Sequence, residues 1–545
     1  MRTGRTLVAI CGGLCGLTVG PALAGDQTQT HVTRSGESDP PVLVAGVLVP
    51  PAVLQPEGRD VRELSVDEAV ALALEQNLDL RVERLNPLIQ DLSIAEARSV
   101  YAPVVGTTVA QRNRTYPATS IFLGSESTNT DESLRNSLDL SQVVPWAGGR
   151  YSATWDGSRA TSTNTFFAFD PLLESNVFLQ YNQPLLRNLG IDSSRLQIAI
   201  TRANRDISDI ALRATIVRTQ RRVRLAYWSL HFAYASLEVA RQSLELAEES
   251  ERNTRRRVEV GTVPGSDIVQ SESEVARNEE GVIVAEAQLD DAEDNLRTLI
   301  FDPDGPDFWS IQIQPTDDPS LQAETIDVEA AIRNALNNRT DIGTLDKQIE
   351  NTDTSIRYYR NQRLPDVDLQ VNYSLNGAGG TEQLRAEGFL GPVTGTRVSS
   401  FGSVLGDIFT NDFPTWRVGV TLRYELGNSF AKASLQRARL ERSQADGRRR
   451  SLEVQIAQEV RRAGRSVITN RQRVEATQTA QDLAERRLQA EQRQLDLGLT
   501  PPFFVVQAQR DLALARNSLA RAVLFYTQSL VDFEAVQEVS LVGGF

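Results

Sequence analysis

The feature that most constrains the fold is a heptad seam that occurs twice, 237 residues apart, with its register kept. In the first copy small and apolar residues recur at steps of three and four: Ile268, Ser271, Val275, Asn278, Val282, Ala285, Leu289, Ala292, Leu296 and Leu299. The second copy runs Val505, Ala508, Leu512, Ala515, Leu519, Ala522, Tyr526, Ser529, Phe533 and Val536. Such spacing is typical of helices that pack along their whole length, and the small residues let the helix axes approach closely.

A further seam precedes the first copy and comprises Val223, Ala226, Leu230, Ala233, Leu237, Ala240, Leu244 and Ala247. If Ser194 to Glu259 is one helix, a rise of ~1.5 Å per residue makes it roughly 100 Å long. A compact domain does not contain a helix of that length. The predicted helices Val66 to Arg98 and Asp267 to Ile300 are each about half as long, so two of them can stack end to end beside the long one.

The helices belong to two tandem repeats. Residues 65–74 are echoed by residues 327–336 at an offset of 262, whereas Gly261–Pro264 matches Gly498–Pro501 at an offset of 237. The offset drops by 25, so the first repeat has extra residues in its middle. The predicted division is signal peptide 1–24, Pro-rich leader 25–62, first helix-strand-helix repeat 63–301, linker 302–324, second repeat 325–538 and C-terminal tail 539–545.

Segments of period two lie between the helices of the second repeat. Apolar residues at 367, 369, 371, 373 and 375 alternate with polar ones, and the same holds for 416, 418, 420, 422 and 424. One apolar and one polar face, with aromatic residues at the ends of the apolar face, is what a strand of a membrane barrel needs. We therefore expect Leu369, Val371, Val418 and Val420 to face lipid, and Gln370, Asn372, Arg417 and Arg423 to face a water-filled lumen.

The first repeat offers weaker strand candidates near Val105 to Ala110, Ser137 to Val144, Tyr151 to Trp155 and Val177 to Tyr181. Residues 111–135, 157–170 and 376–411 are rich in glycine and polar residues and are predicted as loops. The barrel then takes four or six strands per chain, and the pattern does not decide between the two numbers. An extra hairpin that folds over the outside or the lumen is a further alternative.

The N-terminus predicts export. Arg2 and Arg5 precede an apolar stretch from Leu7 to Val19, and Ala22-Leu23-Ala24 resembles a cleavage site. Neither cysteine follows the small residues of a lipidation site, because Ile10 precedes Cys11 and Leu14 precedes Cys15, which favours cleavage over lipidation. The leader 25–62 is expected to be extended and without a fold.

Composition excludes several classes of function. Residues 25–545 contain no cysteine, and two histidines are too few for most zinc sites, so no metal site and no cofactor is expected. Removal of the signal peptide takes away two arginines and no acid, so the formal charge changes from -14 to -16, which makes a nucleic-acid partner a poor fit.

The sequence has no motif of a catalytic or ion-binding site. There is no phosphate-binding loop and no His-Glu-x-x-His motif. Asp302–Gly305 resembles a calcium loop, but the twelfth position is Ile313 where an acid is needed, so we interpret it as linker. No catalytic residue is predicted, and the chain is not expected to be an enzyme.

With these features the chain resembles the TolC-type outer-membrane efflux proteins, also called outer membrane factors, from about residue 64 to 538. The matching motifs are Glu68-Ala69 with Ala73-Leu74, Gln183-Pro184-Leu185, Ala226-Tyr227, Val260-Gly261-Thr262 and Pro365. The resemblance implies an α+β membrane protein: a homotrimer whose strands close one transmembrane β-barrel, continued by a long periplasmic coiled-coil barrel. It also implies that a periplasmic adaptor, or membrane fusion protein, and an inner-membrane transporter are partners, and that outer-membrane lipid surrounds the barrel.

The resemblance makes the two interhelical turns the periplasmic tips. Val260, Gly261 and Thr262 at the first tip, and Leu497, Gly498 and Leu499 at the second, become candidate contacts for an adaptor. The alternative is that these residues only form turns and bind no partner, since glycine ends helices readily. Just past the tips lie the aperture candidates Asp267, Phe503, Phe504 and Gln507. Family members often carry acids at the positions of Phe504 and Gln507, so we hypothesise an apolar constriction made by Phe503 and Phe504. The alternative is that both rings pack into a neighbouring helix.

The sequence therefore predicts a passive outer-membrane exit duct for an efflux or type I secretion system. The main alternative is a periplasmic coiled-coil adaptor or scaffold without a barrel. A purely structural exported coiled coil is a further alternative, but it leaves the alternation at 367–375 and 416–424 without a purpose.

Overall fold

The computed structural model describes residues 61–117, 128–164, 167–305, 308–319, 326–387, 391–427 and 429–538, all within one structural unit. The predicted signal peptide 1–24, nearly all of the leader 25–62, part of the linker 302–324 and the tail 539–545 lie outside the described residues. The helices are α1 (Val66–Gln76), α2 (Leu78–Glu83), α3 (Leu85–Arg98), α4 (Ser193–Glu259), α5 (Ser266–Ile300), α6 (Val328–Asn338), α7 (Thr340–Gln362), α8 (Phe401–Thr410), α9 (Phe430–Asp496) and α10 (Pro502–Ala535), with a short 3-10 turn at Ser99–Tyr101. The strands are β1 (Val61–Leu64), β2 (Val104–Pro117), β3 (Thr128–Val143), β4 (Arg150–Ser162), β5 (Phe169–Pro184), β6 (Gln312–Pro315), β7 (Asp366–Arg385), β8 (Val393–Val398) and β9 (Pro414–Arg423).

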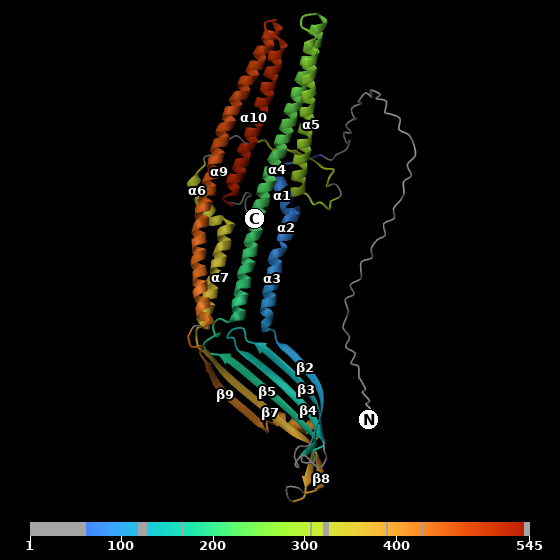
Figure 1. The fold of residues 1–545 in the computed structure, drawn as a ribbon, viewed down its shortest axis with the longest axis vertical. Helices are drawn as coiled ribbons and strands as arrows, with labels where there is room; N and C mark the ends of the chain where they lie inside the picture. Colours follow the sequence, from blue (N-terminus) through green and yellow to red (C-terminus); the bar gives the residue numbers. More distant parts are fainter. Residues whose placement is uncertain are drawn as a thin grey trace, which may run out of the picture. The chain divides into compact units, whose positions relative to one another are not determined.

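Two long helices run the length of the helical part, as predicted. α4 and α9 each have 67 residues, which at ~1.5 Å per residue gives roughly 100 Å. The shorter helices stack end to end beside them: α5 and α1–α3 along α4, and α10 and α6–α7 along α9. Where α1 meets α5, the side-chain amide of Asn77 donates to the carbonyl of Leu299 at 3.0 Å. Figure 1 shows both helical hairpins ending in tips at the end opposite the sheet.

The repeat extends to the helix caps and breaks. Ser65 caps α1 in a capping box with Glu68, and Asp327, which lies 262 residues later, caps α6 by accepting from the amide of Ala330 at 3.0 Å. The helix expected from Val66 to Arg98 is interrupted at Asn77, and the second repeat is interrupted at the matching Arg339. Both residues have extended backbone angles, so the break is part of the repeat.

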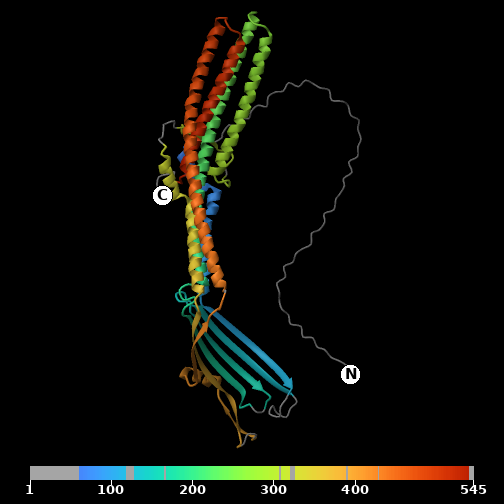
Figure 2. The same cartoon turned by 60° about the vertical axis from the view of Figure 1, so that its left-hand side comes forward.

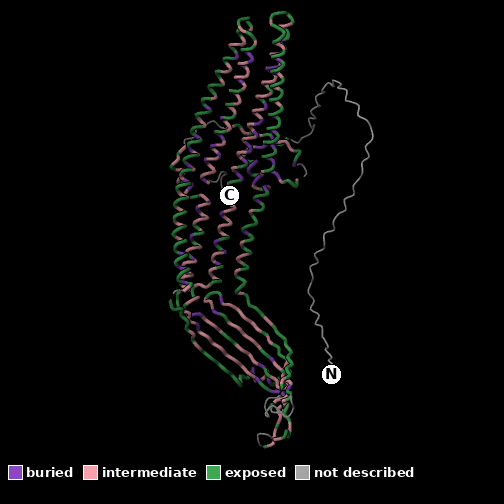
Figure 3. The backbone as a smooth tube through the Cα atoms, in the orientation of Figure 1, coloured by how far each residue is buried: buried purple, intermediate pink, exposed green. Residues whose placement is uncertain are grey.

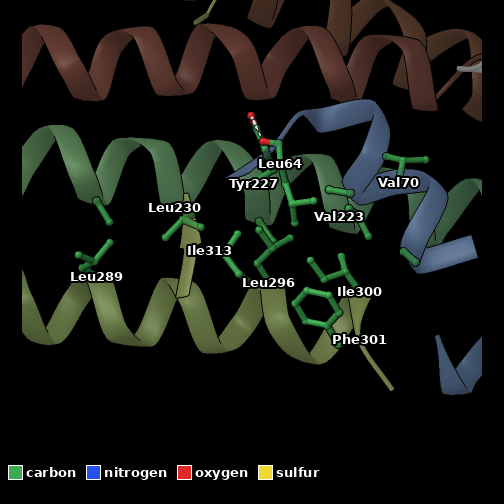
Figure 4. Close-up of a cluster of buried hydrophobic side chains, with 14 of the residues drawn as sticks. Leu64, Val70, Val223, Tyr227, Leu230, Leu289, Leu296, Ile300, Phe301 and Ile313 are labelled. Atoms are coloured by element: carbon green, nitrogen blue, oxygen red, sulfur yellow. Dashed lines mark hydrogen bonds between the residues drawn. The ribbon is translucent and has the colours of Figure 1, made fainter. Parts of the chain in front are cut away.

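The predicted seams form the core. Val223, Leu230 and Leu296 are fully buried in one cluster, and Val460, Ala522 and Tyr526 in a second one of the second repeat. Figure 4 shows the first cluster, in which Tyr227 of α4 lies beside Leu64 and is joined to it by a hydrogen bond. The alternation of small and large seam residues is therefore what brings the helices together.

A two-stranded parallel sheet lies against this first cluster. β1 pairs with β6 in register, from Val61 opposite Gln312 to Leu64 opposite Pro315. The leader was predicted to be without a fold up to residue 62, and this is wrong at Val61 and Arg62, which belong to β1. The reason is tertiary: Leu64 and Ile313 are buried in the helical core, which stabilises two strands too short to be predicted from their own pattern.

The large sheet has seven antiparallel strands, and the six nearest the helices lie in the order β2-β3-β4-β5-β7-β9 (Figures 1 and 2). β7 is long enough to pair with β9 over residues 366–375 and with β8 over 381–385, so β8 occupies the same edge farther from the helices. Pro103 and Pro365 precede β2 and β7, which makes β3 and β4 the hairpin that the first repeat adds. This addition accounts for the change of offset, and the question of four or six strands is answered with six.

The loop predictions for 111–135, 157–170 and 376–411 are largely wrong. β2, β3 and β4 run through much of the first two ranges, and the third contains the end of β7, β8 and α8. These strand ends are polar on both faces. On one face the Asn113 amide donates to Glu132 at 3.0 Å, and on the other Arg112 lies opposite Ser133. Because the ladder is made by backbone groups, strands continue where the hydrophobic alternation has ended.

Candidate channel wall and hairpin tips

The two faces of the large sheet differ in chemistry across every strand pair. Leu369 lies opposite Val420, Val371 opposite Val418, and Tyr373 opposite Trp416. Between them, and therefore on the other face, Asn372 lies opposite Arg417 and Gln370 opposite Gly419. The predicted assignment of apolar and polar faces is confirmed for these two strands.

The apolar face continues through the first repeat. Val105 lies opposite Leu140, Leu140 opposite Ala153, and Ala153 opposite Leu179. Many side chains of this face are exposed although they are large and apolar: Val105, Val109, Leu134, Leu138, Leu179, Trp416, Val418, Val420 and Leu422. An apolar patch of this extent marks a surface that contacts protein or lipid. On β7 the apolar stretch runs over nine residues, 367–375, which matches the 9–11 residues or so of a tilted strand that spans a bilayer.

The polar face is hollowed. A cavity of about 560 Å³ is lined there by Arg135, Asp156, Ser158, Glu174 and Asn176 of β3, β4 and β5, and by Asn376 and Ala378 of β7. Asn176 hydrogen-bonds the hydroxyl of Ser374 at 2.9 Å and the side chain of Asn376. A concave polar face and an exposed apolar face are the arrangement of a barrel wall with water inside.

The sheet has two open edges. Among the described strands β2 pairs only with β3, and β9 pairs only with β7, so the outer edge of each carries backbone donors and acceptors without a strand partner. Open edges are not tolerated within the hydrocarbon of a bilayer, because each unsatisfied peptide group there costs several kcal/mol. The wall of a single chain is therefore incomplete.

The two hairpin tips have the same backbone geometry. Gly261 and Gly498 have φ angles of 75° and 73°, and the amides that follow them, those of Thr262 and Leu499, each donate at 2.9 Å to the carbonyl five residues before. This is the Schellman arrangement, in which glycine takes the left-handed conformation that ends a helix. Val260, Leu497 and Leu499 are each more than 70% exposed, and the tips lie at the end of the helical part in Figure 3.

The aperture candidates follow the tips at the start of α5 and α10. Phe503 and Phe504 contact each other edge to face at 5.5 Å between ring centroids, and they are 50% and 44% exposed. Within the chain neither ring is buried against a neighbouring helix. Asp267 is half-buried in the first turn of α5, and the Gln507 side-chain amide donates to Asp511 at 3.0 Å.

An ion pair that the sequence did not reveal joins the two hairpins behind the tips. Arg510 of α10 donates through Nε at 2.9 Å, and through a terminal nitrogen, to the carboxylate of Glu274 of α5, whose side chain is only 9% exposed. Hydrogen bonding from Arg510 holds the pKa of the Glu274 carboxyl below its ordinary value of 4.5. Nothing in the sequence indicates this pairing, because the partners are 236 residues apart and the register of one hairpin against the other has no repeat or motif.

Comparison with models of known protein families identifies the family of this chain. The model of the family described as outer membrane efflux protein matches residues 150–300 and 331–536. The chain belongs to the outer membrane efflux protein family. It is accordingly an efflux channel and not an enzyme, and its hairpin tips and wall are to be understood in that setting. The matched residues begin at the first residue of β4, so β2 and β3 precede them.

Solved structures of outer-membrane channels share the fold. The CmeC outer membrane channel of Campylobacter jejuni superposes with a TM-score of 0.61 at 14% identity, covering 87% of this chain and 85% of that one. The VceC outer membrane protein of Vibrio cholerae gives 0.58 at 14% identity, covering 87% and 96%. The open state of the MtrE outer membrane channel of Neisseria gonorrhoeae gives 0.57 at 16% identity, covering 87% and 89%. No curated protein sequence matches this efflux protein significantly.

The described residues contain no group of three or more His, Cys, Asp or Glu side chains placed to hold a metal ion. Asp302 instead accepts from Arg81 at 2.8 Å at the surface. None of the helices in the described ranges combines the length and the apolar character needed to cross a bilayer.

Proposed function

We propose that this efflux protein works as a closed trimer in the outer membrane, where its sheets form one barrel and its helices extend into the periplasm. The observation that carries the proposal is the six-strand wall with an exposed apolar face, a hollowed polar face and two open edges. Closure of the edges by further copies of the chain satisfies the backbone groups of β2 and β9. The number three comes from the resemblance to TolC-type channels.

Three copies of this wall make a barrel of eighteen strands. Barrels of 16–18 or so strands leave an aqueous channel. The polar residues of the wall, such as Asn372 and Arg417, line that channel, and the apolar residues contact outer-membrane lipid. The duct is passive: an inner-membrane transporter supplies energy and selects the cargo, as in tripartite efflux or type I secretion.

The tips are proposed as the contact for a periplasmic adaptor. Val260, Leu497 and Leu499 are apolar, exposed and held on a rigid cap, which suits them to a protein partner. Leu497→Glu together with Leu499→Glu should abolish resistance to antibiotics and bile salts that depends on the channel, with the trimer intact. Ser266→Glu, at an exposed polar position near the other tip, is the matched control. If the double variant keeps its resistance, the tips do not contact an adaptor and are only turns.

Phe503 and Phe504 are proposed to narrow the periplasmic entrance, with Asp267 and Gln507 beside them. Their exposed rings are free to meet their counterparts around a threefold axis and to exclude water. Phe503→Ala with Phe504→Ala should raise single-channel conductance in planar bilayers and admit antibiotics to the cell. Val269→Ala, at an exposed apolar site past the first tip, is the control. Unchanged conductance and antibiotic entry in the double variant would rule out the gate.

Membrane fractionation followed by denaturing gels of heated and unheated samples tests the proposal as a whole. A trimer that persists without heating and dissociates with it, in the outer-membrane fraction, is expected. The alternative, a periplasmic adaptor or scaffold without a barrel, predicts a monomer that salt washes off membranes. The exposed apolar face of the sheet argues against that alternative, because it would be left in water.

A further inference from the structure

The helix α8 lies on the lipid side of the wall and not on the lumen side. It packs against β7 and β5 in the connection between β8 and β9 (Figure 2). The wall residues that it covers are Gly157, Gly377 and Gly379, which share the face of Leu375, Val177 and Trp155 in the strand register. This face is the apolar one.

The wall is shaped to receive the helix. A Cβ atom on Gly377 would lie 2.2 Å from the backbone oxygen of Val404, and one on Gly379 would lie 2.7 Å from the Val404 side chain. One on Gly157 would lie 3.4 Å from the Phe401 ring. Three positions without side chains thus let α8 lie flush on the strands, with Val404 and Ile408 buried beneath it.

The helix lies at one end of the apolar band. The band on β7 spans 367–375, and α8 covers the residues that follow, on the side away from the periplasmic helices. Tyr373 and Trp416 form a cross-strand pair at this end, and the Tyr373 hydroxyl donates to Asn411, the C-cap of α8, at 2.7 Å. Aromatic girdles mark the membrane–water boundary of barrels, so α8 lies at the level of the outer boundary.

The outward side of the segment is apolar and aromatic. Phe409 is 87% exposed. Phe413, just after the helix, lies on the other face, where it lines the polar cavity beside Asn376. Within α8 the only titratable residue is Asp407. An exposed phenylalanine that continues a lipid-contacting surface at the boundary level has the chemistry of an interfacial anchor.

We propose that α8 is a membrane-interface helix, and that Phe409 binds the outer-leaflet lipid at the boundary of acyl chains and headgroups. This inference rests on the proposed function, since it needs the wall to face lipid. By this contact the helix fixes the height of the barrel in the membrane. The occupant is lipid because the surface is continuous with the exposed apolar residues of β9, among them Val418 and Val420.

Single-cysteine labelling tests the proposal on the full-length trimer in vesicles. Both cysteines of the chain, Cys11 and Cys15, lie in the predicted signal peptide, so Phe409→Cys introduces one reactive site into the mature protein. A bimane label there is exposed to phosphatidylcholine brominated high on its acyl chains, and separately to aqueous iodide. Val418→Cys reports the lipid face and Asn372→Cys the lumen. Phe413→Cys, at the polar cavity, is a second control on the lumen side.

Strong quenching by brominated lipid at 409, similar to that at 418 and several-fold above that at 372 and 413, is expected. Quenching at 409 by iodide alone, with 418 still quenched by lipid, would overturn the interface helix and leave the channel standing. Protection of the label at 409 from both quenchers would mean that a neighbouring subunit covers α8, and would also overturn it. Absence of lipid quenching at 418 would show that the wall itself does not face lipid, which is a failure of the proposed function.

Discussion

The two repeats place related helical sequences at the same point of their long helices, yet a tyrosine in one and a glycine in the other give them different surroundings. Val223-Arg224-Leu-Ala-Tyr227 of α4 corresponds to Val460-Arg-Arg-Ala-Gly464 of α9 at the offset of 237. The Tyr227 hydroxyl donates to the carbonyl of Leu64 at 3.0 Å and accepts from the amides of Thr316 and Asp317, each at 3.1 Å. At Gly464 there is no side chain, and a Cβ would lie 3.1 Å from Val328 and 3.5 Å from the Phe533 ring.

This difference shows how a duplicated helix acquires two roles. In the first repeat the tyrosine reaches out from the seam and holds the β1–β6 pair against the helices. In the second repeat the glycine lets α6 and α10 pack close to α9. The seam residues on either side, Val223 and Leu230 against Val460 and Val467, remain buried in both repeats. Conservation of the seam therefore does not determine what packs on it.

The largest effect is expected at Tyr227. Tyr227→Ala should cost about 3–5 kcal/mol, because it removes a fully buried ring. Tyr227→Phe should cost only about 0.5–1.5 kcal/mol, since it keeps the ring and removes only the hydrogen bonds of the hydroxyl, while the Thr316 amide still donates to the Leu64 carbonyl. Thermal unfolding of the detergent-solubilised protein, followed by circular dichroism, orders the three proteins. A Tyr227→Phe variant as stable as the wild type would show that water replaces the hydroxyl and that β1–β6 is not held by it.

The second prediction asks whether the strands of both repeats form one lipid-facing wall. Leu140→Arg in the first repeat and Val418→Arg in the second should each cost about 2–4 kcal/mol, as arginine does near the middle of a bilayer on the outer face of a barrel. Ser141→Arg, on the polar face next to Leu140, should be nearly neutral. The yield of heat-labile trimer in outer membranes measures the effect. Tolerance of Leu140→Arg alone would mean that the added hairpin β3–β4 lies away from lipid.

The helices and the face alternation of the second-repeat strands could be predicted from sequence because each is a local period. Val223 to Ala247 and Val367 to Leu375 carry such periods. The polar ends of β2 and β3 could not be predicted, because backbone pairing there needs no apolar pattern. The position of α8 on Gly377 and Gly379, and the pairing of Glu274 with Arg510, depend on how distant segments meet. Gly261 and Gly498 were predicted to lie in turns. Their left-handed conformation is what glycine commonly adopts where a helix ends.

A smaller effect is expected where the second repeat has no side chain. Gly464→Leu should destabilise the protein by about 1–3 kcal/mol, because the added atoms meet Val328 and Phe533 in a packed core. The midpoint of thermal unfolding measures the loss, and Gly447→Leu, at a position of α9 with open space around it, is the control. If Gly464→Leu is as stable as the control, close packing is not the reason for the glycine.

The smallest effect distinguishes the repeats near the tips. Glu274 bonds across to Arg510 of the other hairpin, whereas its counterpart Asp511 bonds within its own hairpin, to Arg487 at 2.8 Å. Glu274→Gln should therefore let the two tips separate, and Asp511→Asn should not. Spin labels at Thr262→Cys and Leu499→Cys report the distance between tips by pulsed electron resonance, since the mature chain has no other cysteine. Equal distances in both variants would mean that packing alone keeps the hairpins together.

Acidification should act like Glu274→Gln, and its sign follows from the lowered pKa. A carboxyl with a pKa below its ordinary value of 4.5 contributes its full stabilisation above that value, and the contribution is lost as the pH falls through the lowered pKa. The tips should hence stay together at neutral pH and separate only in strongly acidic buffer. In the Glu274→Gln variant this step should disappear, because the group that titrates is gone. A step that persists in the variant would assign the titration to a different carboxylate between the hairpins.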